Sequence, residues 1–172
     1  MDLAAYIRDI PDFPQEGVLF KDITPLLGNP EAFRQAVDTI ASAFADEGVT
    51  KVVGAEARGF IFGGALAYVL GAGFVPARKP GKLPWNTTRT EYALEYGTNV
   101  LEVHSDALGP EDVALIVDDV LATGGTAAAK DKLVVTTGAR VAGFAFLIEL
   151  DFLSGREMLP EGAKIVSLIH VA

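Results

Sequence analysis

The sequence predicts an α/β fold: a single-domain, mainly parallel sheet flanked by helices, with a flexible flap or hood. Short apolar runs alternate with longer helix-forming stretches along the 172 residues. Residues 113–117, Val-Ala-Leu-Ile-Val, form an uninterrupted apolar run that is typical of a strand buried on both faces. A hydrophobic content of 50% in a chain of this length supports one complete core. We therefore expect residues 1–172 to form one domain.

At the N-terminus we expect a short helix over residues 2–9, followed by an irregular stretch over 11–28. A longer helix is expected over 30–46. Asn29 is a favourable N-cap for it, and Pro30 fits the first helical turn, where its missing N–H costs no hydrogen bond. One long helix therefore precedes the first expected strand.

The middle of the chain is expected to form a strand over 51–55, a helix over 59–70 and a strand over 73–78. Residues 60–77 carry no charge, and this run of about eighteen residues approaches the length of a membrane-spanning helix. Glycines and Pro76 divide it, which favours a buried helix with a glycine stop and then an internal strand. We therefore expect no membrane span.

Residues 78–90 form a basic loop in an acidic protein. The segment carries four cations and no acid, and its prolines and glycine exclude a regular helix or a central strand. Residues 91–96 and 100–104 are expected to be extended and to pair as a hairpin, so that 79–104 forms a flap. A loop of this kind is typical of a solvated surface or of a mobile lid over a polyanionic ligand.

The C-terminal third continues the alternation, with a strand over 113–117, a helix over 126–137 and strands over 140–149 and 164–169. Strands separated by helices predict a parallel sheet with right-handed crossovers, and such sheets bind ligands at the carboxyl ends of their strands. Three segments are expected to meet at that edge, namely Glu56-Ala57-Arg58-Gly59, the basic loop, and the loop that follows the 113–117 strand.

The loop that follows the 113–117 strand has the features of a phosphate site. Gly124 and Gly125 let an anion approach the backbone without meeting a Cβ atom, and the next helix offers unpaired N–H groups and partial positive charge. Thr123 and Thr126 add hydroxyl donors. The loop therefore predicts an anion held at a helix N-terminus.

An acidic pair, Asp118 and Asp119, comes directly before this loop. Because carboxylates repel phosphate, the pair is expected to face sugar hydroxyls or a metal ion, and a phosphorylated sugar satisfies both requirements. The alternative is that Asp119 is a strand-end turn residue and that the glycines only make a tight connection. The combination of acids, glycines and a long apolar strand favours the ligand site.

Composition disfavours several other classes of function. A net charge of −9 disfavours nonspecific nucleic-acid binding, which depends on a surplus of cations. The chain has no cysteine, which fits a reducing compartment, and its first residues show no basic segment ahead of an apolar one, so we expect a cytoplasmic protein. His104 and His170 lie far apart without neighbouring ligand spacing, which disfavours a zinc site.

Several segments resemble a known family. Residues 117–126, Val-Asp-Asp-Val-Leu-Ala-Thr-Gly-Gly-Thr, are similar to the phosphoribosyl-pyrophosphate motif of type I phosphoribosyltransferases. Further segments resemble adenine phosphoribosyltransferases in order and spacing over nearly the whole chain: Phe13-Pro-Gln-Glu-Gly-Val-Leu-Phe-Lys-Asp-Ile-Thr24, Glu56-Ala-Arg-Gly-Phe60, Arg78-Lys-Pro-Gly-Lys-Leu-Pro84, Leu94-Glu-Tyr-Gly97 and Gly155-Arg-Glu157. The motif alone specifies the superfamily; the 13–24 and 94–97 segments indicate adenine.

The resemblance implies transfer of a phosphoribosyl group from phosphoribosyl pyrophosphate to adenine, giving AMP and pyrophosphate, in a type I phosphoribosyltransferase fold. It implies magnesium bound mainly through the substrate diphosphate and water, with no direct protein ligand, and a homodimer. Two alternatives stay open: the same reaction with a 6-oxopurine such as hypoxanthine, guanine or xanthine, and a non-catalytic regulator that senses phosphoribosyl pyrophosphate. A regulator usually needs an added DNA-binding module, for which an acidic single domain leaves no room.

The resemblance also implies roles for individual residues in the donor site. The 5′-phosphate would be held by Ala122, Thr123, Gly124, Gly125 and Thr126. The ribose hydroxyls would be held, directly or through magnesium-bound water, by Asp118 and Asp119. Pyrophosphate would be bound by Arg58, Arg78, Lys79 and Lys82. The catalytic residues would be Glu95, Arg58, Asp118 and Asp119, with Tyr96 beside Glu95 at the donor.

For the base, the resemblance places adenine in the 11–28 segment against Phe20. Backbone groups of Leu19 and Lys21 would read the adenine edge, Val120 would cover its other face, and Glu95 would manage a purine-ring proton. Two plainer interpretations remain: Phe20 as a core aromatic and Glu95 as a rim carboxylate. Many relatives carry arginine at the position of Lys21, so a backbone contact is the one expected there.

Overall fold

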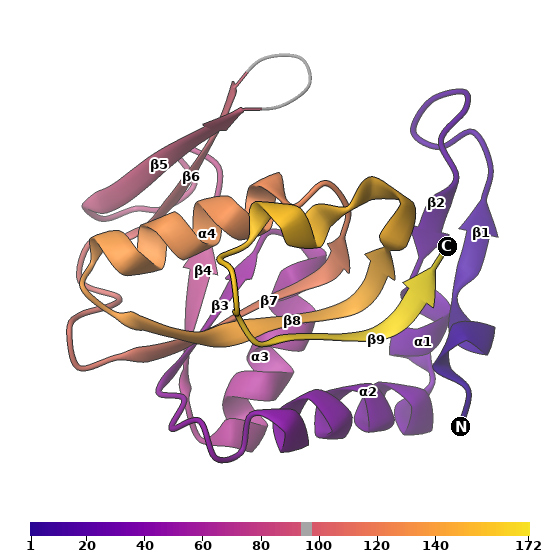
Figure 1. Cartoon of the computed structure of the whole chain (residues 1–172), viewed down its shortest axis with the longest axis horizontal. Coiled ribbons are helices and arrows are strands. Elements are labelled where there is room, and N and C mark those ends of the chain that lie inside the picture. The colour runs from indigo at the N-terminus through magenta and orange to yellow at the C-terminus, as the bar shows by residue number, and fades with distance from the viewer. Residues whose placement is uncertain (94–97) are drawn as a thin grey trace.

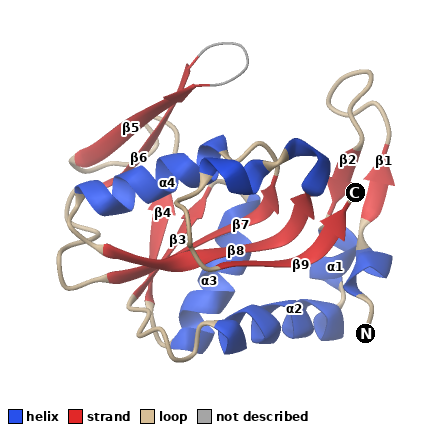
Figure 2. Ribbon diagram, in the orientation of Figure 1, coloured by secondary structure: helices blue, strands red, loops and turns tan. Residues whose placement is uncertain are grey.

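The structure, a computed structural model, describes residues 1–93 and 98–172 (Figure 1). In chain order its elements are the 3₁₀ helix η1 (Leu3–Tyr6), β1 (Arg8–Ile10), β2 (Phe20–Asp22), α1 (Thr24–Gly28), α2 (Pro30–Ala43), β3 (Lys51–Ala55), α3 (Arg58–Leu70), β4 (Gly73–Ala77), β5 (Thr87–Ala93), β6 (Thr98–His104), β7 (Val113–Leu121), α4 (Gly125–Thr136), β8 (Arg140–Leu150), the 3₁₀ helices η2 (Asp151–Leu153) and η3 (Gly155–Met158), and β9 (Ile165–Val171). Figure 2 shows them by type. The alternation confirms the predicted α/β class.

A five-stranded parallel sheet lies at the centre of the described part of the chain, in the order β4-β3-β7-β8-β9. β7 takes the middle position because its residues 114–117 are apolar and all 0% exposed, as burial on both faces requires. Two antiparallel pairs, β1 with β2 and β5 with β6, stand apart from the sheet (Figure 1). The mainly parallel sheet flanked by helices is therefore confirmed.

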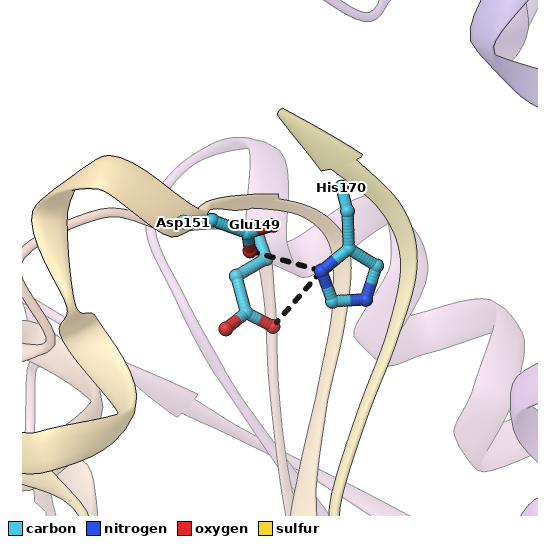
Figure 3. A group of neighbouring side chains, drawn as sticks. All are labelled: Glu149, Asp151 and His170. Atoms are coloured by element: carbon cyan, nitrogen blue, oxygen red, sulfur yellow. Dashed lines mark hydrogen bonds and ion pairs between the residues drawn. The ribbon is translucent and has the colours of Figure 1, made fainter. Parts of the chain in front are cut away.

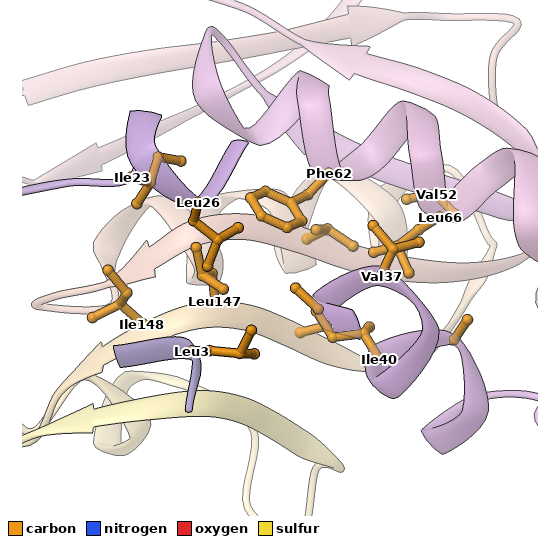
Figure 4. Close-up of a cluster of buried hydrophobic side chains, with 14 of the residues drawn as sticks. Leu3, Ile23, Leu26, Val37, Ile40, Val52, Phe62, Leu66, Leu147 and Ile148 are labelled. Atoms are coloured by element: carbon orange, nitrogen blue, oxygen red, sulfur yellow. The ribbon is translucent and has the colours of Figure 1, made fainter. Parts of the chain in front are cut away.

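Helices cover both faces of this sheet. α2 and α3 pack on one face, where Phe62 and Leu66 are buried among the residues of the larger hydrophobic cluster (Figure 4). α4 packs on the other face, where Leu133 and Val134 are buried in a second cluster that also includes residues of β6. Burial of each side chain of this size contributes about 1.5–3 kcal/mol. The sheet therefore separates two cores.

Successive residues of β7 alternate between these two cores. Leu115 and Val117 belong to the cluster under α2 and α3, and Ile116 belongs to the cluster under α4. Because side chains alternate across a strand, Asp118 is directed toward α4 and Asp119 toward α3. The acidic pair is thus divided between the two faces of the sheet.

Most of the expected helices and strands are confirmed. β3 has the predicted bounds, and β4, β8 and β9 differ from prediction by a few residues at their ends. The Asn29 side chain accepts hydrogen bonds from two N–H groups in the first turn of α2, as predicted for an N-cap. α3 ends at Gly71, whose φ of 65° is the left-handed conformation of a glycine stop. β5 and β6 pair antiparallel, as expected for the hairpin. β5 begins at Thr87, however, inside the stretch expected to be a loop, and residues 94–96 of the expected strand lie outside the described residues.

Three expectations were wrong. The helix expected over 2–9 ends at Tyr6, because the residues that follow form β1. The stretch 11–28, expected to be irregular, contains β2 and α1. β1 and β2 pair antiparallel, and strands of 3 residues leave no periodic signal in a sequence. The strand expected to end at 117 continues to Leu121, because β8 extends alongside it and pairs with its last residues.

The uncharged run over 60–77 divides between α3 and β4, as predicted. Across residues 1–93 and 98–172, no helix is both long and apolar enough to cross a membrane.

Candidate functional site

Three sequence-distant segments meet where neighbouring strands end. β4, β3 and β7 are adjacent in the sheet and run parallel. Arg58 begins α3 a few residues after β3, and Arg78 follows β4 directly. The acidic pair lies near the carboxyl end of β7, just past the point where β3 stops pairing with it. In Figure 1 the arrowheads of β7 and β8 lie between the two antiparallel pairs. The predicted meeting of these segments at one edge is therefore confirmed.

The 122–126 loop, which runs from the end of β7 into the first turn of α4, surrounds a small cavity of about 70 Å³ that Asp118 and Val120 also line. This volume is far below the roughly 300–1,000 Å³ of a drug-sized site, so it suits a single chemical group. Gly124 has a φ of 86°, and a Cβ atom there would collide with the carbonyl oxygen of Gly155. Glycine is therefore required at position 124 both by its backbone conformation and by close packing against η3.

The N-terminus of α4 gives this cavity its electrostatic character. The cap residue, Gly124, offers no side-chain hydrogen bond, and the first turn contains no acidic residue. The backbone N–H groups of that turn therefore have no side-chain acceptor and keep their partial positive charge. A cavity of this kind binds anions such as phosphate.

Asp118 is held by a buried cation. The Nζ atom of Lys130 donates to Oδ2 of Asp118 at 2.7 Å and to the backbone oxygen of Val117 at 2.8 Å. The Lys130 side chain is 0% exposed. Oδ1 of Asp118 accepts from the backbone N–H of Asp119 at 3.1 Å, so both carboxylate oxygens have donors within the protein. The carboxylate is therefore fixed in position.

Asp119 has a different partner on the other face of the sheet. Nε of Arg58 lies 2.7 Å from Oδ2 of Asp119, without the direction that a hydrogen bond requires. Burial, together with the neighbouring charge of Asp118, raises the pKa of Asp119 to about 6, and the charge of Arg58 offsets part of that rise. In the described residues Oδ2 thus keeps acceptor capacity for another donor.

Arg58 also connects the acidic pair to the N-terminal segment. Its guanidinium carbon lies 4.7 Å from the centre of the Phe20 ring, within range of a cation–π contact. Phe20 is half-buried and makes an edge contact with Phe13, with ring centres 5.1 Å apart. The expected base segment and the acidic pair are therefore neighbours, with Arg58 between them.

The residues before and after Phe20 differ from it in their exposure and in their contacts. The Leu19 side chain is exposed. Nζ of Lys21 donates to Asp9 at 2.7 Å, which commits this side chain to β1. A contact between Lys21 and a ligand would therefore come from its backbone, as expected from the sequence. Val120 lines the cavity beside Asp118.

Glu56 anchors the basic loop that follows β4. Its carboxylate accepts from the backbone N–H of Lys79 at 2.7 Å and from Nη2 of Arg78 at 3.3 Å. The hydrogen bond from Lys79, and then the charge and hydrogen bond of Arg78, lower the pKa of Glu56 despite some burial. Arg78 also pairs through its backbone with Glu102 of β6, while Lys79 and Lys82 stay exposed. The loop is thus tied to the same edge as Arg58.

A second group of polar side chains lies at the ends of β8 and β9 (Figure 3). Nδ1 of His170 is 2.9 Å from Asp151 and 4.0 Å from Glu149. Although three such residues are able to hold a metal ion, both oxygens of Glu149 accept from Arg156, at 2.6 and 2.8 Å. The Arg156 guanidinium balances the charge of Glu149, so the group is better described as an ion-pair network.

The chain is similar to known proteins over nearly its whole length. A family model described as phosphoribosyl transferase domain matches residues 25–170. A protein of Anaeromyxobacter dehalogenans named adenine phosphoribosyltransferase is 57% identical, over 96% of this chain and 95% of its own length. The chain belongs to the adenine phosphoribosyltransferase family.

Solved structures of adenine phosphoribosyltransferases share the fold. The Rhodothermus marinus protein is 52% identical and superposes with a TM-score of 0.95, over 98% of this chain and 96% of the other. The Giardia lamblia APRTase, solved in complex with 9-deazaadenine, is 40% identical with a TM-score of 0.93, over 100% and 99% of the two chains. The type I phosphoribosyltransferase fold expected from the sequence is confirmed.

Most residues expected from the family resemblance are brought together at one edge. The 122–126 loop, Asp118, Asp119 and Val120 surround the cavity or adjoin it, and Arg58 and Phe20 lie beside Asp119. Lys79 and Lys82 are on the anchored basic loop. Glu95 and Tyr96 fall outside the described residues.

Sequence reasoning did not predict the roles of two residues at this edge, Lys130, which had no expected place there, and Glu56, which lay in a segment expected there. The signal for Lys130 was present, because it follows Ala127 by three residues and precedes Val134 by four on the buried stripe of α4. A lysine on such a stripe needs a buried acceptor. Glu56 gave no local signal, since its partners follow a different strand.

Proposed function

We propose that this protein transfers the 5-phosphoribosyl group of phosphoribosyl pyrophosphate to adenine, giving AMP and pyrophosphate for purine salvage. One observation carries the proposal: an anion cavity at the N-terminus of α4 adjoins the carboxylates of Asp118 and Asp119 in a chain of the adenine phosphoribosyltransferase family. The cavity suits the 5′-phosphate, and the acids suit the hydroxyls of the same sugar.

The 5′-phosphate is assigned to the 122–126 loop. Backbone N–H groups and the Thr123 and Thr126 hydroxyls donate to its oxygens, and Gly124 keeps the approach open. The ribose hydroxyls are assigned to the acidic pair. The Oδ2 atom of Asp119, buried and without a directed hydrogen bond in the described chain, supports this assignment because a hydroxyl would supply the missing donor.

During the reaction, N9 of adenine bonds to C1′ while the bond from C1′ to the diphosphate oxygen breaks. The oxygen keeps the electron pair, so positive charge develops on the ribose and negative charge on the leaving group. The Asp119 carboxylate stabilises the first, and Arg58, with Arg78, Lys79 and Lys82 on the anchored loop, stabilises the second. Cations at this edge therefore bind the transition state better than the ground state.

The base is assigned to Phe20. Its ring offers an apolar face for stacking, and the backbone groups of Leu19 and Lys21 supply donors and acceptors for the adenine edge, with Val120 on the opposite side. The proton that leaves N9 is assigned to Glu95, beside Tyr96. The Giardia lamblia relative in complex with an adenine analogue supports a purine in this fold.

Magnesium is proposed to enter with the donor diphosphate. The donor set fits this, because Lys130 and Arg58 already balance the charges of the acidic pair, and a direct metal ligand would have to displace one of these cations. The ion neutralises charge on the diphosphate oxygens when it is bound. Asp118 and Asp119 would contact it through water.

A base-competition assay tests the function. Each purine base is offered with phosphoribosyl pyrophosphate and magnesium, and nucleotide formation is measured by chromatography. We expect AMP from adenine and at least about 100-fold lower kcat/KM for hypoxanthine, guanine and xanthine, a discrimination typical of sites with hydrogen-bond readout. A preference for a 6-oxopurine would overturn the choice of base. Tight donor binding without turnover on any base would favour the sensing regulator.

Two further proposals concern assembly, which follows from the family resemblance, and location, which follows from composition. A homodimer is proposed, and light scattering of the purified protein measures it directly. A cytoplasmic location is also proposed, supported by the absence of cysteine from the sequence, since disulfides are common in secreted proteins. Fractionation of cells that express the chain tests the location.

A further inference from the structure

The phosphate cavity contains an electrostatic conflict. Asp118 lines the cavity together with the 122–126 loop, so a carboxylate charge lies in the wall of the space in which a phosphate is proposed to bind. Two like charges at close range repel, and the repulsion is strong where water is scarce. An anion site with an uncompensated carboxylate in its wall would therefore bind phosphate poorly.

The buried Lys130 side chain compensates the charge of Asp118 from the interior side of the cavity wall. Its Nζ atom is 2.7 Å from Oδ2 of Asp118 and its side chain is 0% exposed, so no solvent competes for the ammonium. The second acceptor, the backbone oxygen of Val117, lies 2.8 Å away and fixes the ammonium at the end of β7. The charge on the cavity wall is thus cancelled by a cation that no ligand can reach.

The carboxylate is also fixed in direction. Oδ1 of Asp118 accepts from the backbone N–H of Asp119 at 3.1 Å. A Cβ atom added at Gly59 would lie only 2.6 Å from the same oxygen, so the first turn of α3 packs closely against it. With one oxygen packed and the other bound to Lys130, the carboxylate cannot turn into the cavity and occupy the place of the phosphate.

We propose that Lys130 is a positioning residue for the phosphate of the donor and of the nucleotide product: its buried ammonium cancels the charge of Asp118 and holds that carboxylate against the cavity wall. The inference rests on the proposed function, because it takes the 122–126 cavity as the phosphate site. Lys130 does not touch substrate; it acts through Asp118.

Substitution of Lys130 by an uncharged residue of similar length tests the proposal. In Lys130→Met the Asp118 charge is uncompensated, and at pH 8 we expect AMP to bind at least about tenfold more weakly, the size expected for a charge contact in a partly buried site. AMP affinity is measured by titration calorimetry. KM for phosphoribosyl pyrophosphate should rise by a similar factor, while KM for adenine, which has no phosphate, changes by less than about threefold.

Two further variants separate charge from general damage. Lys132→Met removes a positive charge from the exposed side of the same helix and should leave AMP affinity within about twofold of wild type. The double variant Asp118→Asn/Lys130→Met removes both members of the ion pair. It should bind inorganic phosphate, which has no ribose to contact Asp118, within about threefold of wild type, whereas Lys130→Met should bind it at least about tenfold more weakly. The double variant also covers the case in which Lys130→Met alone fails to fold.

The possible failures are distinguishable. A wild-type protein that neither binds nor forms AMP overturns the proposed function. Wild-type binding together with equal binding by Lys130→Met overturns the role of Lys130 alone. A folded double variant that loses inorganic phosphate as severely as the single variant, or a loss of AMP in Lys132→Met that matches the loss in Lys130→Met, would also overturn it, because charge cancellation at Asp118 would then not explain the effect.

Discussion

Asp118 and Asp119 are neighbours in the sequence, but the two faces of the sheet supply them with different cations. On the α4 face, the Lys130 side chain is 0% exposed, and its bonds within residues 1–93 and 98–172 go to atoms near the end of β7. On the α3 face, Arg58 is 38% exposed and divides its contacts between Asp119 and the Phe20 ring. One carboxylate has a buried partner, and the other has a partner in contact with solvent.

This difference indicates which cation is able to serve a ligand. If the Lys130 ammonium lost its carboxylate partner, a fully buried charge would remain uncompensated, at a cost of several kcal/mol. The Arg58 guanidinium is 38% exposed, so its solvent-facing side can bind a diphosphate while it stays beside Asp119. Lys130 therefore has a fixed role, whereas Arg58 is available to the leaving group.

The largest expected effect is on the stability of the fold and comes from the ion pair on the α4 face. Lys130→Met leaves Asp118 without its partner and should lower the free energy of unfolding by about 3 kcal/mol. Asp118→Asn/Lys130→Met removes both charges and should recover most of that loss. Urea denaturation measures both variants, with Lys132→Met as the control on the exposed side of α4. Equal free energies of unfolding for wild type and Lys130→Met would contradict the fixed role assigned to the buried ion pair on the α4 face.

The next effect concerns catalysis on the α3 face. Asp119→Asn keeps the size of the side chain but removes the charge that stabilises the positive ribose, so kcat should fall on the order of 100-fold with the fold retained. Steady-state kinetics measure the fall, and circular dichroism checks the fold. Unchanged kcat would refute the ribose assignment of Asp119.

Asp119→Asn also has a pH-dependent effect on stability. Folding raises the pKa of Asp119 from 3.8 to about 6, so between these pH values the folded chain binds more protons than the unfolded chain. The contribution of this group to stability therefore falls as the pH rises, by up to about 3 kcal/mol. We expect Asp119→Asn to melt above wild type at pH 8, and the difference to vanish near pH 4. A lower Tm at pH 8 would contradict this sign.

The strength of local signals explains how much of this fold was predictable. The 113–117 run, the Asn29 cap and the Gly71 stop are signals within one element, and each predicted its element. β1 and β2 were missed because their stability comes from pairing with each other across a loop, and 3 residues leave no period to detect. Tertiary pairing with β8 likewise extended β7 beyond the carboxylates.

The candidate site divides in the same way. The 122–126 loop was predictable because glycines and a helix start act through the local backbone. The cations that pair with the acidic residues could not be predicted in this way. Arg58 and Lys130 reach β7 from helices on opposite faces of the sheet, and these contacts depend on how the helices pack. The helical spacing places Lys130 on a buried stripe, but only the packed structure identifies its acceptor.

A moderate effect is expected at the aromatic partner of Arg58. Phe20→Ala removes the face assigned to adenine, and the loss of one base–aromatic stack, about 1–3 kcal/mol, should raise KM for adenine about tenfold. KM for phosphoribosyl pyrophosphate should change much less. Tyr68→Ala, at the exposed far end of α3, is the control for loss of an aromatic side chain. Equal changes in both KM values would remove Phe20 from the base site.

The smallest expected effect concerns the basic loop after β4, whose cations are assigned, together with Arg58, to the leaving group. Glu56 fixes this loop through the backbone N–H of Lys79 and the side chain of Arg78. Glu56→Gln keeps an acceptor but removes the charge, so these contacts weaken and KM for phosphoribosyl pyrophosphate should rise about threefold, the size of one modest hydrogen bond at a partly exposed site.

Glu111→Gln is the matched control, because Glu111 is exposed at the amino end of β7, away from the site. Since Glu56 is held ionised by its partners, its pKa lies below the usual range and the effect should be constant from pH 6 to 8. An unchanged KM would mean that the loop cations act without this anchor. Arg58 would then be the cation on which the leaving group mainly depends.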